Sequence, residues 1–345
     1  MILNLSLVKL QMMKLLPKIK KILLNAFIIF VLSLLLFEVL YRNSVIDFYK
    51  AETAHLNSEA DLATTSADFL VFGDSFSATA KEINYIDKLR EYNPEKRFVN
   101  VSVPGIGIRQ VNTFASSKIK KHHPKAIIYQ IYVGNDLTDV DHLWNWEKFS
   151  LVRNIYWGIS DYFLSLSYLN HKLAAFSPRV TSRSYTMATD EFRPEYYDER
   201  TKRFLNFDAN YFNNALMLKA PFASRYETWL AEMHEFLETI PQEIPVYLVW
   251  IPHCSQVNSY YRNNLNEIGA TFEDEVAIQQ SDYPFLAKAS KDLQTYTNVI
   301  QINPLSVFQV NDTNDNRLYF ANDPHINNEG NTVLSDFLQS ELQLE

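Results

Sequence analysis

The sequence predicts an α/β fold, with a parallel five-stranded sheet covered by helices on both faces, behind a single membrane-spanning helix. From about residue 68 onward, short apolar runs rich in β-branched and aromatic residues alternate with helix-compatible segments. This alternation is typical of parallel strands joined by right-handed crossovers. A chain of 345 residues, 47% of them hydrophobic, can bury a full core as one domain, with or without a large insertion.

The N-terminus predicts a membrane anchor. Residues 22–41 are apolar apart from Asn25, Ser33 and Glu38, and about 20 such residues cross the hydrocarbon layer. The lysines that precede this stretch are Lys9, Lys14, Lys18, Lys20 and Lys21. Because positive charge stays inside, residues 1–21 are expected in the cytoplasm and the remainder in the periplasm or outside the cell. No A-x-A cleavage site follows closely, which favours a retained anchor over the alternative, a cleaved signal peptide.

Residues 42–66 contain mainly Ala, Ser, Thr and acidic residues, and we expect a tether or a juxtamembrane helix there. Six of the 32 Lys and Arg residues and one of the 40 Asp and Glu residues precede residue 43, so 26 basic and 39 acidic side chains follow. An acidic exterior argues against nucleic acid as a partner. Cys254 is the only cysteine, which excludes an intramolecular disulfide and multi-cysteine metal sites. It is expected to be a small buried residue rather than a nucleophile.

The five expected strands are 69–72, 98–103, 126–133, 245–251 and 298–302. Helices are expected at about 77–92, 107–122, 224–240, 284–297 and 328–343. In a parallel sheet the carboxyl ends of all strands share one edge, where ligands collect. Glycine is rare, with seven residues in the chain, yet five of them fall in motifs near these strand ends or the last helix, where special backbone geometry is expected: Gly73, Gly105, Gly107, Gly134 and Gly330.

The first strand stops at Gly73-Asp74-Ser75. A glycine at this edge lets the backbone turn tightly and exposes the next side chain, so Ser75 is the candidate nucleophile. Such a tripeptide is also common in ordinary turns. The interpretation therefore depends on the later motifs.

The second and third strands end in turns that can supply hydrogen-bond donors. Acyl transfer needs donors aimed at the oxygen that becomes negative, and the N–H groups of Ser75 and Gly105 with the Asn135 amide suit this role. The structural alternative is that Gly105 and Gly134 only permit turns and that Asn135 caps a helix.

Asp323-Pro324-His325 precedes the last expected helix. Proline favours extended geometry at Asp323, and side chains two apart on an extended segment point to the same side. His325 can then take the proton of a serine while Asp323 fixes its tautomer. The order along the chain is Ser, Asp, His.

These motifs resemble the SGNH hydrolases, also called GDSL esterases and lipases. The matching blocks are Gly73-Asp74-Ser75, the turn from Asn100 to Gly105, Gly134-Asn135-Asp136 and Asp323-Pro324-His325. The resemblance covers about 68–139 and 224–343, and implies a flavodoxin-like three-layer α/β/α fold and ester hydrolysis without a metal or other cofactor. It also implies that Ser75 is the nucleophile, that Ser75, Gly105 and Asn135 form the oxyanion hole, that His325 is the base and that Asp323 orients it.

The chain departs from the common family pattern at two points. Asn322 stands three residues before His325, where the family commonly has Asp, and Asp323 is only two before it. Val133 replaces the first glycine of the third block. These departures concern the role of Asp323 and the shape of the loop before Asn135.

An aromatic-rich insertion at about 140–223, within a domain expected to span 67–345, is predicted to cap the site. Its aromatic side chains are expected mainly to form the core of the cap, and alternatively to contact sugars or acyl chains. His142 and His253 follow expected strand ends and are further candidates, although packing roles are the simpler interpretation for both.

Three functions fit these motifs. The first is an anchored serine esterase that removes acyl groups, such as O-acetyl, from a cell-surface glycan or lipid. The second is an O-acyltransferase that uses the same residues on an exopolysaccharide. The third is a non-catalytic factor that binds polysaccharide or assists its export. The residues do not specify the substrate or a protein partner.

Overall fold

The computed structural model describes residues 2–43, 45–47, 49–78, 83–140, 155, 158, 159, 162–166, 168, 191–197 and 210–344. A five-stranded parallel sheet forms the centre of the domain, in the order β2-β1-β3-β4-β5. The strands are β1 (Phe69–Phe72), β2 (Phe98–Asn100), β3 (Ala126–Tyr132), β4 (Val246–Ile251) and β5 (Val299–Ile302). This order is that of flavodoxin-like folds, in which the chain reverses direction across the sheet next to β1. The predicted fold class is therefore confirmed.

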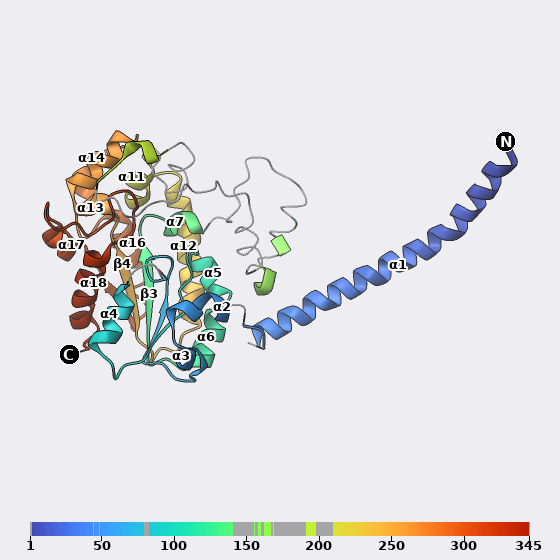
Figure 1. Ribbon diagram of the computed structural model, residues 1–345, viewed down its shortest axis with the longest axis horizontal. Coiled ribbons are helices and arrows are strands. Elements are labelled where there is room, and N and C mark those ends of the chain that lie inside the picture. Colours follow the sequence, from blue (N-terminus) through green and yellow to red (C-terminus); the bar gives the residue numbers. More distant parts are fainter. Residues whose placement is uncertain are drawn as a thin grey trace.

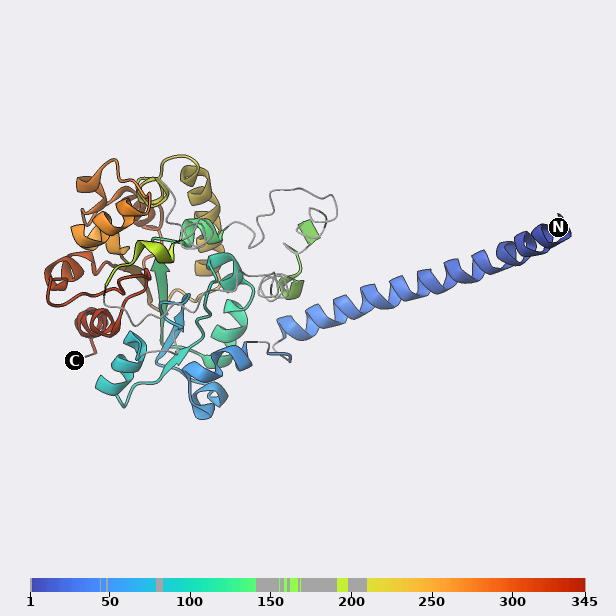
Figure 2. The same cartoon turned by 45° about the horizontal axis from the view of Figure 1, so that its top comes forward.

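Helices cover both faces of the sheet (Figures 1 and 2). On one face α4 (Tyr85–Tyr92) packs against α18 (Asn328–Glu341), with α17 (Leu305–Asn311) beside it. On the other face α12 (Phe222–Glu238) packs against α5 (Ile108–Asn112) and α7 (Asp136–Asp139), with α6 (Ala115–His122) following α5. Other short elements among the described residues of the domain are α11 (Tyr211–Leu216), α13 (Cys254–Val257), α14 (Ser259–Glu267), α15 (Glu275–Ile278), α16 (Pro284–Asp292) and η2 (Pro194–Tyr196).

The core lies between the sheet and these helices. β1 and β3 are buried at every position, as expected of strands covered on both faces. On the α12 face, Phe285 meets the indole rings of Trp229 and Trp250 edge-on, with ring centroids 5.3 and 5.1 Å apart. Such large buried rings contribute several kcal/mol each through the surface they remove from water. This packing holds the strands, and so the loops at their carboxyl ends, in place.

The observed elements differ from the predicted ones mainly at their ends. The helix expected over 107–122 is two helices, α5 and α6, which are separated at Thr113 and Phe114. β2 ends at Asn100 rather than at 103, yet Val101 N donates to Val71 O and Val103 N donates to Gly73 O. The backbone after β2 therefore still follows β1 to the glycine turn.

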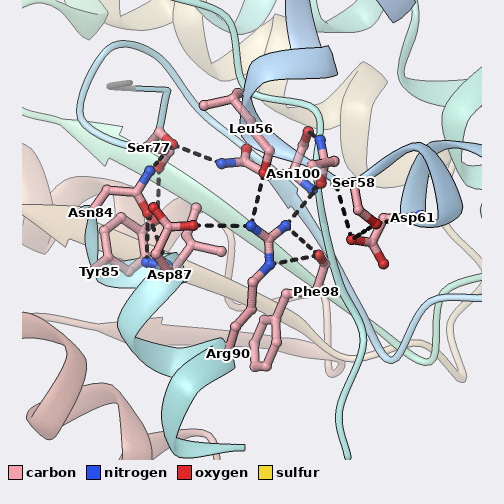
Figure 3. A network of polar contacts seen from close by, with 12 residues as sticks. Leu56, Ser58, Asp61, Ser77, Asn84, Tyr85, Asp87, Arg90, Phe98 and Asn100 are labelled. Carbon is pink, nitrogen blue, oxygen red and sulfur yellow. Dashed lines mark hydrogen bonds and ion pairs between the residues drawn. The ribbon is translucent and has the colours of Figure 1, made fainter. Parts of the chain in front are cut away.

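The segment 42–66, predicted as a tether or juxtamembrane helix, contains α2 (Lys50–Thr53), η1 (Ala54–Leu56) and α3 (Glu59–Ala63) and packs on the domain. Asn57 exchanges two hydrogen bonds with the backbone of Asn100, of 2.8 and 2.7 Å. Arg90 of α4 donates to the carbonyls of Leu56 and Phe98, as Figure 3 shows. Through these contacts the segment 42–66 packs against β2, the strand at this edge of the sheet.

Helix α1 (Ile2–Arg42) projects away from the domain (Figure 1). Its part from Pro17 to Arg42 is long and apolar enough to cross a membrane. The domain and the end of α1 meet where α2 and α6 lie, and these contacts are described below.

Candidate active site

Ser75 lies directly after β1, in the sharp turn that Gly73 begins. A Cβ at Gly73 would come within 2.5 Å of Gln130 Oε1 and 2.9 Å of Ser77 Oγ. Gln130 of β3 reaches under the turn, and its Oε1 accepts hydrogen bonds from Asp74 N and Ser77 Oγ, both of 3.1 Å. The glycine is thus required by a buried side chain of the neighbouring strand. This arrangement leaves Ser75 partly exposed at the edge of the sheet.

Ser75, His325 and Asp323 are brought together in a hydrogen-bonded chain. Ser75 Oγ lies 2.7 Å from His325 Nε2, across 250 residues of sequence. His325 Nδ1 is hydrogen-bonded to Asp323 Oδ1, which also accepts the His325 backbone N–H at 2.9 Å. A carboxylate at Nδ1 favours the tautomer that carries its proton there, which leaves Nε2 as the acceptor for the serine hydroxyl.

The loop that carries Asp323 and His325 is fixed at both ends. Tyr319 and Ile326 form an antiparallel bridge, and Phe320 N donates to His325 O at 3.2 Å. Asn327 caps α18 by accepting from Gly330 N at 3.0 Å. The residue pair is therefore presented on a short hairpin-like loop just before the helix.

His325 also packs on an aromatic side chain from the serine turn. The Phe76 ring stacks on the imidazole with centroids 4.6 Å apart, and the ring of Tyr132 also packs on Phe76, with centroids 4.1 Å apart. The side chains of His325 and Asp323 keep 28% and 16% of their surface exposed. The imidazole is therefore held in one orientation but remains within reach of solvent and ligand.

Asn135 lies at the same edge and is oriented by Asp74. Its Nδ2 donates to Asp74 Oδ2 at 2.9 Å, while Asp74 Oδ1 accepts from Phe76 N at 2.9 Å. Burial raises the pKa of the Asp74 carboxyl, although the hydrogen bonds from Phe76 and Asn135 oppose this shift. A primary amide has two N–H groups, so Asn135 can keep this bond and donate a second one toward the site. Sequence reasoning did not assign this role to Asp74.

Gly105 lies on the adjacent loop, in the left-handed backbone region at φ 72°. The loop is tied to the serine turn by the hydrogen bond from Val103 N to Gly73 O. Glycine adopts such a φ without cost, whereas other residues are strained by about 1–2 kcal/mol. Gly105 is exposed in the turn between β2 and α5.

Asn322, which stands where the family pattern commonly has Asp, holds a segment of the insertion. Its Oδ1 accepts from Arg193 N at 2.8 Å and its Nδ2 donates to Glu191 O at 2.7 Å. Phe192 and Tyr197 from this segment line a hollow together with Asp323 and Pro324. The amide oxygen and nitrogen of Asn322 are therefore both hydrogen-bonded to the backbone of the predicted cap. The bonding partners of Asn322 lie more than a hundred residues away in the sequence, so the motif alone could not predict this role.

The other candidates lie outside this chain of contacts. His253 is fully buried, stacks on Phe212 with centroids 3.7 Å apart, and accepts from Ser255 N. Burial lowers the pKa of His253 to about 3 and raises the pKa of the Cys254 thiol. Both are therefore packing residues in their uncharged forms.

His142 lies outside the described residues, as does most of the predicted cap. Within the described part of the chain, no group of three or more His, Cys, Asp or Glu residues is arranged to hold a metal ion.

No protein family model matches the chain, and no curated protein matches it. Among solved structures, a Streptococcus pneumonia protein whose description names platelet activating factor is 11% identical, with 90% of this chain and 99% of that chain covered and a TM-score of 0.43. A catalytic mutant of the acetylxylan esterase Axe2 from Geobacillus stearothermophilus is 12% identical, with 82% and 96% covered and a TM-score of 0.38. The lipase Lip_vut3 from a goat rumen metagenome is 11% identical, with 80% and 97% covered and a TM-score of 0.37.

Proposed function

We propose that this protein is a membrane-anchored serine esterase of the SGNH hydrolase type, which removes acyl groups from a cell-surface glycan or lipid. The observation that carries the proposal is the contact of 2.7 Å between Ser75 Oγ and His325 Nε2, together with the hydrogen bond from His325 Nδ1 to Asp323. A serine, a histidine and a carboxylate in this geometry form the constellation that activates a hydroxyl for acyl transfer. A non-catalytic role would not require this alignment.

In the first step, Ser75 Oγ attacks the ester carbonyl carbon while His325 Nε2 takes its proton. The tetrahedral oxyanion would be held by the N–H groups of Ser75 and Gly105 and by the Asn135 amide. When the intermediate collapses, the C–O bond to the alcohol breaks and His325 returns the proton to the departing oxygen. Asp323 stabilises the imidazolium in between. The products are an acyl-Ser75 ester and a free alcohol.

In the second step, water attacks the acyl-Ser75 ester and His325 again accepts and returns one proton. The carboxylic acid leaves and the serine hydroxyl is restored. A sugar hydroxyl in place of water would make the same intermediate an acyltransferase. We favour water as the acceptor because the His325 side chain is 28% exposed, so solvent reaches the base. Transfer instead requires that a bound sugar hydroxyl attack the acyl-Ser75 ester faster than water does, which exclusion of water from the site favours.

The anchor supports a location at the membrane surface. The apolar span of residues 22–41, which lies within the stretch from Pro17 to Arg42 that is long and apolar enough to cross a membrane, would hold the domain at the bilayer, with residues 1–21 in the cytoplasm and the domain in the periplasm or outside the cell. Ester-linked acyl groups on surface glycans and on lipids are the substrates within reach from that position.

The test is ester hydrolysis by the full chain in detergent, measured on acetyl, medium-chain and long-chain esters. Replacing Ser75 or His325 by Ala is expected to lower kcat/KM by at least about a thousandfold, since each removes the nucleophile or its base. Ser340→Ala, at an exposed position of α18, is the matched control and should leave the rate unchanged. Full activity of Ser75→Ala would exclude the proposal. Acylated glycan that accumulates when donor and acceptor are supplied together would favour transfer.

A further inference from the structure

The last turn of α1 is hydrogen-bonded to part of the insertion, residues 162–166 and 168, which we call the clasp. The Glu38 carboxylate accepts hydrogen bonds from Leu164 N at 3.0 Å and Ser165 N at 2.9 Å, and from the Ser165 hydroxyl. Arg42 forms an ion pair with Glu38 at 2.6 Å and donates to Tyr162 O at 3.2 Å. Glu38, the one acidic residue of the apolar span, is thereby satisfied by the clasp.

The same end of α1 is fixed to the domain from the other side. The ring of Tyr168 in the clasp stacks on Tyr41 and meets Tyr49 edge-on, with centroids 6.3 and 4.7 Å apart. Tyr49 continues to Phe114, at 4.1 Å, between α5 and α6. Asp47 pairs with the buried Lys118 of α6 at 2.5 Å. Anchor, clasp and domain therefore share one packed contact.

Helix geometry sets the depth of the clasp if α1 spans a bilayer. A helix rises about 1.5 Å per residue, so Glu38 lies about 6 Å nearer to the bilayer centre than Arg42. The headgroup layer on each side is about 5–7 Å thick, which is half the difference between the whole bilayer and its hydrocarbon core. Because Glu38 and Arg42 are at the end of the span, a segment that bonds both of them lies at the boundary between the hydrocarbon core and the headgroup layer.

The residues near the clasp have the side chains expected at that depth. Ile155, Ile159 and Tyr162 are 55%, 44% and 79% exposed. Between residues 154 and 170 the sequence has one charged residue, Asp161, and it includes Tyr156, Trp157 and Tyr162. Tyr and Trp are enriched at membrane interfaces. On α1, Leu36 and Val39 of the span are also exposed, at 60% and 55%.

We propose that the face formed by Ile155, Ile159 and Tyr162 inserts into the headgroup layer of the leaflet from which α1 emerges. The partner is lipid, and the inference depends on the membrane anchoring proposed above. The domain is then attached to the bilayer at two places, the span and this face, which fixes its orientation. The active site is thereby held at a constant height above the surface.

Spin labels on the full chain in lipid vesicles test this inference. In a Cys254→Ala background, a nitroxide is placed at Ile159→Cys, at Ile29→Cys in the middle of the span, and at Val310→Cys as the matched control. Val310 is 79% exposed on α17, distant in sequence from the clasp. Collision rates with oxygen, which partitions into lipid, and with a water-soluble nickel chelate are compared. At positions 159 and 29 oxygen should exceed the chelate, and at 310 the order should be reversed.

The outcomes separate the two proposals. If position 29 behaves as lipid-exposed and position 159 behaves like position 310, the inserted face is wrong while the anchor stands. If position 29 behaves like position 310, the anchor fails and the inference with it. A second variant, Glu38→Leu, removes the acceptor of the clasp but keeps the span apolar. It should increase the mobility of the label at 159 and its collisions with the chelate, and unchanged spectra would contradict the role given to Glu38.

Discussion

At the scale of single residues, the adjacent side chains of Asn322 and Asp323 have different roles: Asp323 bonds His325, and Asn322 bonds the predicted cap. Asp323 accepts from the imidazole and backbone of His325, whereas Asn322 accepts from Arg193 N and donates to Glu191 O. A carboxylate at 322 could not donate to Glu191 O. The shorter Asp-Pro-His spacing is therefore consistent with the contacts that both residues make.

This division predicts how the two positions respond to exchange. Asp323→Asn keeps the shape but no longer stabilises the Nδ1–H tautomer or the imidazolium, so kcat should fall by about 10³–10⁴-fold. Restoring an Asp at the usual spacing with Asn322→Asp should not rescue it, because that side chain faces the cap backbone. Steady-state kinetics of the single and double variants check this. Recovery of activity in the double variant would show that 322 can reach the imidazole.

Asp74 and Asn135 form a second pair that can be tested together. Asn135→Ala removes one proposed oxyanion donor and should lower kcat by about 10²–10³-fold with little change in KM. Asp74→Leu removes the acceptor that orients the amide and should lower kcat in the same direction, and the double variant should be no worse than Asn135→Ala alone. Losses that multiply would mean that the two residues act independently. Circular dichroism of each variant controls for folding.

At the scale of elements, the start of α13 contains a buried titratable group. His253 has its pKa lowered to about 3 by burial, against about 6.5 in an unfolded chain. Between these values the unfolded chain binds a proton that the folded chain does not, so stability rises with pH over that range and is lost on acidification. From pH 7 to pH 5 this residue should lower the free energy of unfolding by about 2 kcal/mol.

Urea unfolding followed by tryptophan fluorescence, in detergent at several pH values, measures this effect. His253→Asn keeps an acceptor for Ser255 N but cannot take up a proton, so its stability should depend less on pH than that of the natural chain. His122, whose pKa is lowered to about 4 by burial and then by Lys121 and Lys118, should account for part of the remaining slope. Identical slopes for both proteins would contradict the assignment.

At the scale of the whole molecule, the sequence predicted the features that depend on residues close together in the chain. Apolar runs located all five strands, and the spacing of Asp323 and His325 predicted that they would be presented together, because both depend on neighbouring residues. The contacts of Asn57 with Asn100 and of Glu38 with Ser165 join segments 43 and 127 residues apart. No local sequence pattern marks such pairs. The packing of 42–66 on the domain and the contacts of the clasp with α1 could therefore be seen only in the structure.

The central claim is that Ser75 is an activated nucleophile, and covalent labelling tests it most directly. The full chain is treated with a fluorophosphonate probe, and the labelled peptide is identified by mass spectrometry. The account predicts a label on Ser75, absent in Ser75→Ala and formed at least about 100-fold more slowly in His325→Ala, because the imidazole removes the hydroxyl proton. An unlabelled Ser75 in the folded natural chain, or equal labelling rates with and without His325, would contradict it.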